Sequence, residues 1–249
     1  MLETKEREDL KRMGRAIADM AADLHKNGNV ENSLFIVPER GGGPIFQGLV
    51  RALGQLGHKE IHAVHLPASS IVENRDKNVH EIVSKILKKN RGKYSKIYII
   101  DEVVSGSSAN MVRKAVVEAV KAMDESKEWK RWYWQKLPVQ VISLAAYNGE
   151  KINGRIRKLA AQGSFRFYKM HGRIPTMDRE DISPVRYPDV RRIVYSKRQE
   201  KMAKVVGPHI LYDPQNKETW EAVKRAIEEG VLERLSEIRA SIENKRKTQ

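Results

Sequence analysis

The chain has 249 residues, of which 40% are hydrophobic and 32% are charged, and its formal net charge is +15 at pH 7. This length suits one sizeable α/β domain with additions, and the composition excludes disorder for the bulk of the chain. The absence of cysteine excludes disulfides, thiolate metal sites and thiol nucleophiles. The sequence has no apolar run near the roughly 18–20 residues of a membrane span and no signal-peptide pattern at its start, so we expect a cytoplasmic protein without membrane contacts.

Residues 1–28 predict an amphipathic helix that docks on the rest of the chain. Apolar residues recur there at intervals of three and four positions: Leu10, Met13, Ile17, Met20 and Leu24. Gly28 follows the last of them and marks the expected end of the helix.

Residues 29–170 predict a core in which strands and helices alternate. Short apolar runs predict five strands, at residues 33–37, 61–66, 96–100, 139–146 and 165–170. Helical spacing of apolar residues follows the first three strands, at residues 45–56, 79–87 and 111–123. The alternation predicts an α/β fold with a mostly parallel twisted sheet flanked by helices.

The remainder divides into two parts. Three prolines interrupt a charged stretch and predict a hood or lid-like irregular segment over residues 171–212. Residues 213–249 predict a C-terminal amphipathic helix, whose apolar period runs from Trp220 to Ile242 and is interrupted only by Gly230. The apolar stripes of the two terminal helices need a partner surface, which is either the chain's own domain or a second subunit of a homo-oligomer.

The segment 97–110 carries the clearest chemical pattern. An apolar strand is followed by the carboxylates of Asp101 and Glu102, then by a small-residue turn and the start of a helix. Gly106 permits close approach of the backbone to a phosphate, and Ser105 with its neighbours adds hydroxyl donors. In an open parallel sheet, ligands bind at the carboxyl ends of strands, and a following helix N-terminus favours an anion.

The two carboxylates suit a different part of the ligand. An acid beside a phosphate would repel it unless the acid faces sugar hydroxyls or a divalent cation, so Asp101 and Glu102 are candidate ribose or magnesium contacts. The alternative is purely structural, with Asp101 capping the loop and Ser107 or Ser108 capping the helix.

This segment resembles the phosphoribosyl diphosphate motif of type I phosphoribosyltransferases. The resemblance implies that Asp101 and Glu102 are catalytic, contacting the ribose and, indirectly, Mg²⁺ as cofactor. It also implies that the 5′-phosphate binds the turn formed by Ser105, Gly106, Ser107 and Ser108. With Gly106 aligned to the family's glycine, one of the family's acidic positions is occupied by Ile100, so whether transfer activity is retained stays open.

A second segment falls in the family's order. The run Pro38-Glu39-Arg40-Gly41-Gly42-Gly43 after the first strand is similar to the family's diphosphate-binding loop. The resemblance implies that Glu39, Arg40, Gly41 and Gly42 contact the substrate, because Arg40 can fork two oxygens and the glycines expose their N–H groups.

Two further segments match the family by position alone. Residues 69–80 stand where the family has a mobile loop, with Arg75 and Lys77 as candidate anion contacts. Residues 173–187 stand where the family's hood covers the acceptor.

The resemblance implies an enzyme that transfers phosphoribose from phosphoribosyl diphosphate, or a related sugar phosphate or nucleotide, to a nitrogen nucleophile with release of diphosphate. The alternative is a non-catalytic relative whose basic surface binds nucleic acid, a ribonucleoprotein or a protein partner. Similar stand-alone members occur in bacterial conflict systems. Residues 129–136 hold three tryptophans among cations, which suits either base stacking or a protein interface.

Overall fold

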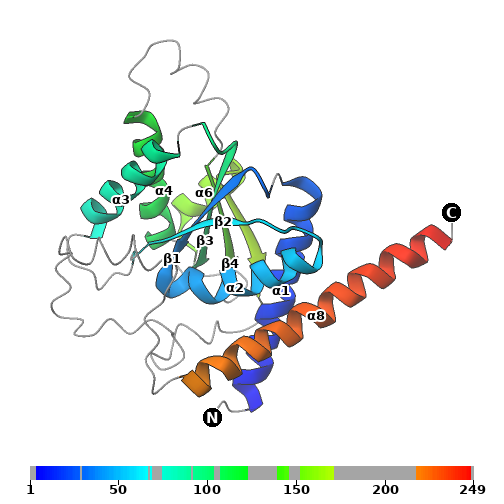
Figure 1. Ribbon diagram of the computed structural model, residues 1–249. Helices are drawn as coiled ribbons and strands as arrows, with labels where there is room; N and C mark the ends of the chain where they lie inside the picture. Colours follow the sequence, from blue (N-terminus) through cyan, green and yellow to red (C-terminus); the bar gives the residue numbers. More distant parts are fainter. Residues whose placement is uncertain are drawn as a thin grey trace.

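The computed structural model describes residues 4–28, 30–66, 68, 75–90, 92–103, 107–122, 139–145, 152–170 and 217–247. It shows a parallel β-sheet with helices on both faces (Figure 1). The predicted hood at 171–212 and the tryptophan-rich segment at 129–136 lie outside these residues. Among the helices described, none is both long enough and apolar enough to span a membrane.

The sheet has five strands, and all neighbouring pairs are parallel. The strands are β1 (Ser33–Pro38), β2 (His62–Leu66), β3 (Lys96–Val103), β4 (Val139–Ala145) and β5 (Phe165–Lys169). Their order across the sheet is β2-β1-β3-β4-β5. The chain therefore moves from β1 to one side, then returns to β3 on the other, which creates a topological switch point between β1 and β3. The predicted α/β class with a parallel sheet is confirmed.

Six helices of the described residues cover the sheet. They are α1 (Thr4–Asn27), α2 (Glu39–Gln55), α3 (Arg75–Lys89), α4 (Ser107–Ala122), α6 (Gly154–Ala161) and α8 (Lys217–Lys247). Buried residues form two cores, one for each face of the sheet. Helices α1, α2 and α8 contribute to the first core, and α3, α4 and α6 contribute to the second (Figure 1). We refer to these two sets of helices as the terminal layer and the central layer.

The central strands are apolar because both of their faces are covered. Every residue of β1 is buried, as are most residues of β3, which is the pattern expected for strands in the middle of a parallel sheet. Helix α6 was not predicted from the sequence because it has only eight residues. A side-chain cap fixes its start, since Asn153 Oδ1 accepts a 3.0 Å hydrogen bond from the backbone N–H of Ile156.

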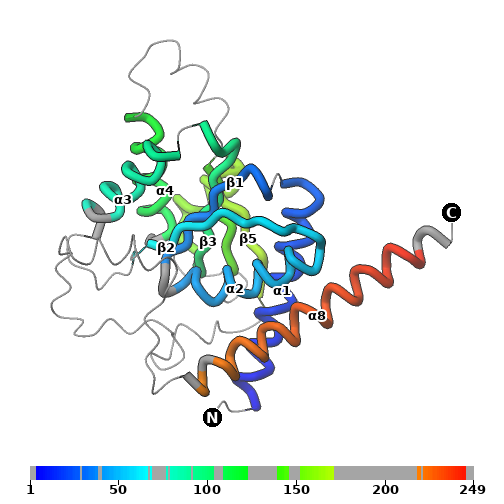
Figure 2. The backbone as a smooth tube through the Cα atoms, viewed as in Figure 1, coloured from blue at the N-terminus to red at the C-terminus, as the bar shows by residue number. Residues whose placement is uncertain are grey.

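The two terminal helices pack against each other in parallel. A Cβ at Gly14 would lie 2.9 Å from the backbone nitrogen of Val231, and one at Gly230 would lie 2.8 Å from the carbonyl carbon of Lys11. Both glycines are therefore needed for the close approach of α1 and α8. The apolar stripes of the terminal helices thus have a partner surface within the chain itself, and α8 runs on past the crossing toward the C-terminus (Figure 2).

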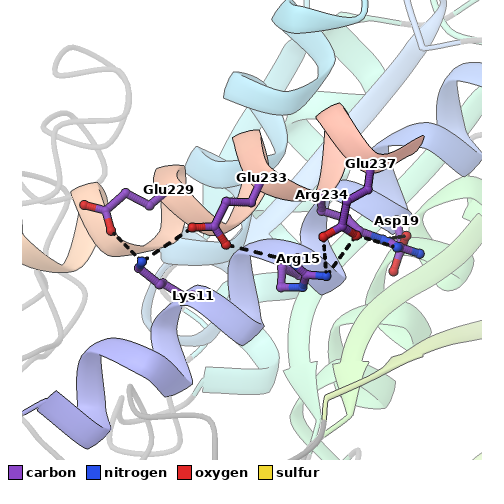
Figure 3. Close-up of polar contacts among 7 residues, drawn as sticks. All are labelled: Lys11, Arg15, Asp19, Glu229, Glu233, Arg234 and Glu237. Carbon is purple, nitrogen blue, oxygen red and sulfur yellow. Dashed lines mark hydrogen bonds and ion pairs between the residues drawn. The ribbon is translucent and has the colours of Figure 1, made fainter. Parts of the chain in front are cut away.

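A series of ion pairs flanks this crossing along the two helices (Figure 3). Lys11 Nζ lies 3.1 Å from Glu229 and 3.5 Å from Glu233. Arg15 lies 2.7 Å from Glu237, and Arg234 on α8 lies 2.8 Å from Asp19 on α1. Both partners advance together from Arg7–Glu229 through Lys11–Glu233 to Arg15–Glu237, which fixes the parallel register.

Candidate functional site

The candidate site lies where β1 and β3 end at the carboxyl edge of the sheet. Helix α2 begins directly after β1 at Glu39, and α4 begins at Ser107, shortly after β3 ends at Val103. Two helix N-termini therefore reach the same edge on either side of the switch point. This is the position at which doubly wound sheets bind ligands, and the helix N-termini favour an anion there.

The predicted diphosphate loop at residues 38–43 is wrong as secondary structure, because residues from Glu39 onward form the first turn of α2. The reason is tertiary packing. A Cβ at Gly41 would lie 2.8 Å from Glu102 Cγ and closer still to Asp101 Oδ1, and one at Gly42 would overlap the carbonyl oxygen of Ile100. The glycines let the helix start press against the end of β3, where a side chain has no room.

The first turn of α2 retains the donors that an anion needs. Its N-cap residue is Pro38, which has no side-chain acceptor. The backbone N–H groups of Glu39, Arg40 and Gly41 stand at positions that have no acceptor within the helix. The side chains of Glu39 and Arg40 lie outside the described part of the structure. The turn therefore offers backbone donors, as the sequence predicted, but from a helix and not from a loop.

Asp101 and Glu102 are the last polar residues of β3, and their prediction as part of a loop is also wrong, because the strand continues through Val103. The Asp101 side chain is only 4% exposed. Its Oδ1 accepts a 2.9 Å hydrogen bond from the Glu102 backbone N–H. Burial raises the pKa of Asp101 to about 7, a rise that this hydrogen bond partly offsets.

The burial of Asp101 is unusual because no described residue compensates its charge. No described Lys or Arg forms an ion pair with this carboxylate. Buried carboxyl groups without a cationic partner are rare in structural roles and concentrate at binding and catalytic sites.

The structure adds Ser143, which sequence reasoning missed. Ser143 on β4 is the register partner of Asp101 on β3, so the two side chains lie on the same face of neighbouring strands. Ser143 is fully buried, and its Oγ has no hydrogen-bond partner among the described residues. Ser143 is the single polar residue within the run 141–145 of β4, and this was the available signal, because a buried hydroxyl without a partner costs free energy unless it serves a ligand.

Two residues of the predicted phosphate-binding turn lie in a helix. Ser107 and Ser108 belong to the first turn of α4, and residues 104–106 lie outside the described residues. The side chains of these two serines, and all of Ser105 and Gly106, lie outside the described residues. The start of α4 after β3 matches the strand, turn and helix order on which the phosphate prediction rests.

Arg75 and Lys77 were predicted in a loop, but both lie in the first turn of α3. The apolar residues that follow pack on the second core and extend the helix back to Arg75. Lys77 is exposed, and the Arg75 side chain is outside the described part of the chain, as are residues 69–74. Lys77 makes no hydrogen bond or ion pair with any described residue at the edge formed by β1 and β3.

No family model, curated protein or solved structure matches this chain. The chemistry of the site therefore has to be argued from its own residues. In the described regions no three His, Asp or Glu side chains converge as a metal site. Asp101 and Glu102 are adjacent on a strand and alternate between its faces, so they fit a magnesium ion only through a bound substrate or water and not as a direct chelate.

Proposed function

We propose that the edge at which β1 and β3 end binds phosphoribosyl diphosphate or a related sugar phosphate or nucleotide. The observation that carries the proposal is the close approach of Gly41 to Asp101 and Glu102. This close approach brings together the two segments that resemble the diphosphate and ribose-phosphate sites of type I phosphoribosyltransferases. The five-stranded parallel sheet with helices on both faces supports a phosphoribosyltransferase-like fold.

Each end of the ligand has donors of suitable chemistry. The start of α2, with the backbone N–H groups of Arg40 and Gly41, receives the diphosphate. The start of α4, with the preceding residues 104–106, receives the 5′-phosphate. The carboxylates of Asp101 and Glu102 accept hydrogen bonds from the ribose hydroxyls between these two anionic groups, and the Ser143 hydroxyl lies beside Asp101 on the neighbouring strand.

The proposed reaction is transfer of the phosphoribosyl group. The lone pair of a nitrogen nucleophile forms a bond to the anomeric carbon, and the bond from that carbon to the diphosphate oxygen breaks. Diphosphate leaves with the electron pair, and the nucleophile releases its proton to solvent. Magnesium bound to the substrate would neutralise the negative charge that develops on the departing diphosphate. The contribution of the chain is to orient the sugar between fixed donors at the two helix N-termini.

Calorimetric titration with phosphoribosyl diphosphate and MgCl₂ tests the binding step. The wild-type protein is expected to bind, and Asp101→Asn to bind at least about tenfold more weakly, since an amide replaces the acceptor for the ribose hydroxyls. Asp101→Asn is expected to fold at least as well as the wild type, because a neutral amide suits a buried site. Glu60→Gln, an exposed acid in the connection before β2, is the matched control.

Two outcomes would count against the proposal. Absence of binding by folded wild-type protein would sink the ligand assignment. Binding that Asp101→Asn leaves unchanged would place the ligand elsewhere. The transfer step is tested separately by measuring magnesium-dependent diphosphate release with purines, pyrimidines and simple amines as acceptors. Tight binding without release for any acceptor would restrict the site to a binding function.

A further inference from the structure

The two helix layers carry very different charge. In the central layer, α3 has five Lys or Arg against two Asp or Glu, α4 has three against one, and α6 has three against none. In the terminal layer, α1 has six against five, α2 has two against one, and α8 has eight against seven. The excess of cations is therefore eight in the central layer and three in the terminal layer, although the terminal layer is much longer.

The cations of the two layers also differ in their surroundings. Those of the terminal layer include Lys11, Arg15 and Arg234, which are held in the ion pairs between α1 and α8 (Figure 3). On the central layer, Lys114, Arg155 and Lys158 are exposed and form no ion pair with any described residue. Their charge is therefore directed to solvent and is available to an external anion.

A groove in the central layer gathers side chains from all three of its helices. Its volume is about 490 Å³, and it is lined by His80 of α3, Lys114 and Glu118 of α4, and Arg155 of α6, with Asn153 at the α6 N-cap. The groove thus combines cations with hydrogen-bonding groups near the start of α6. Such a combination suits phosphate oxygens, which accept hydrogen bonds from both kinds of group.

We propose that the central layer binds the phosphodiester backbone of a nucleic acid, with this groove as the centre of the contact. We define the cationic face as Lys88, Lys89, Lys114, Arg155 and Lys158, all of which are exposed. It spans three helices, an extent that suits a polymer of phosphates better than a single nucleotide. This proposal is independent of the sugar-phosphate site at the ends of β1 and β3.

The same face is a poor surface for a protein partner. Protein interfaces place apolar or aromatic anchors at their centre and deplete charge there. The exposed large apolar side chains of the described residues are Val50, Leu232 and Ile242, and these lie on α2 and α8 in the terminal layer. The cationic face has the charge of a nucleic-acid surface without the apolar centre of a protein interface.

The test is fluorescence anisotropy with a labelled 20-nucleotide RNA, and with single- and double-stranded DNA of the same sequence, between 50 and 200 mM KCl. The variant combines Lys114→Gln, Arg155→Gln and Lys158→Gln. The control combines Lys5→Gln, Lys26→Gln and Arg225→Gln, which removes the same charge from exposed positions of the terminal layer. We expect the groove variant to weaken binding about tenfold or more and to reduce the salt slope by about two, because each phosphate contact contributes roughly 0.7–0.9 to that slope.

The remaining outcomes are equally decisive. Binding of RNA or of DNA supports the proposal, and the preferred form identifies the source of the backbone. Equal weakening by the two triple variants would overturn it, because only net charge would then matter. Absence of binding to every probe at 50 mM KCl would also overturn it. Competition by polyglutamate as strong as that by RNA of equal charge would reassign the face to an acidic protein.

Discussion

The two helix layers use charged residues in opposite ways. In the terminal layer, acidic residues of α8 face basic residues of α1, and the pairs align two helices that are distant in sequence. In the central layer, cations greatly outnumber anions, and Lys114 and Arg155 line a groove that is open to an external ligand. The comparison shows that a net charge of +15 is not a property of the whole surface. The positions of the charged residues distinguish those that join α1 to α8 from those that we propose bind a ligand.

The largest expected effect concerns Asp101, whose charge belongs to neither layer. Its pKa is about 7 in the folded protein, against an ordinary value of 3.8, so the folded state binds the proton more tightly than the unfolded state does. Protonated Asp101 therefore favours the folded state. This contribution to the free energy of unfolding is fully present below pH 4 and is lost as the pH rises to about 7. At 1.36 kcal/mol per pKa unit, the loss is roughly 4 kcal/mol.

Urea denaturation between pH 4 and 8, with EDTA and without ligand, measures this effect. The free energy of unfolding of the wild type is expected to fall relative to that of Asp101→Asn across this range. The two proteins should differ little at pH 4 and most above pH 7. Parallel pH profiles for the two proteins would show that Asp101 ionises freely and is not the uncompensated buried acid described above.

The next effect concerns the crossing that holds the terminal layer together. Gly230→Ala is expected to lower the free energy of unfolding by about 2–3 kcal/mol, because the added Cβ would meet the backbone of Lys11, which cannot move as a flexible side chain can. Gly54→Ala in α2 is the matched control, since a Cβ there meets nothing within 4 Å. The control should be neutral or stabilising by up to about 1 kcal/mol. Equal thermal stabilities for the two variants would contradict the close crossing.

The smallest effect compares single charges in the two layers. Arg15 and Glu237 are 39% and 46% exposed, so their coupling in a double-mutant cycle with Arg15→Gln and Glu237→Gln should be small and should decrease in 1 M salt. Lys114→Gln should leave the thermal stability unchanged or raise it slightly, because it removes one charge from a cation-rich layer. A loss of stability for Lys114→Gln as large as that for Arg15→Gln would remove the distinction between the layers.

The sequence predicted the central strands β1 and β3 well because each is a short apolar run that the sheet buries on both faces. The run at residues 33–37 corresponds to β1, and the stripe from Leu10 to Leu24 corresponds to the buried face of α1. The strand order could not be predicted, because it depends on which strands pair across the sheet. The pairing of α1 with α8 was equally hidden, since it depends on contacts between residues more than 200 positions apart.

The sequence predicted which residues form the candidate site better than it predicted their conformation. Asp101 and Gly41 were both named from local motifs, and the structure brings them into proximity. The three consecutive glycines indicated a loop, yet they form a helix start because packing against β3 outweighs their low helix propensity. Ser143 was missed because its significance appears only in the register between β3 and β4.

The parallel pairing of α1 and α8 determines when the terminal layer can form during biosynthesis. Contacting residues on the two helices are separated by 222 positions, as Arg7 and Glu229 are. At a translation rate of about 5–20 residues per second, α1 is complete roughly 10–45 seconds before its partner leaves the ribosome. During that interval the Gly14 face of α1 is uncovered, and the nascent chain presents an apolar helix that a chaperone or a neighbouring chain can bind.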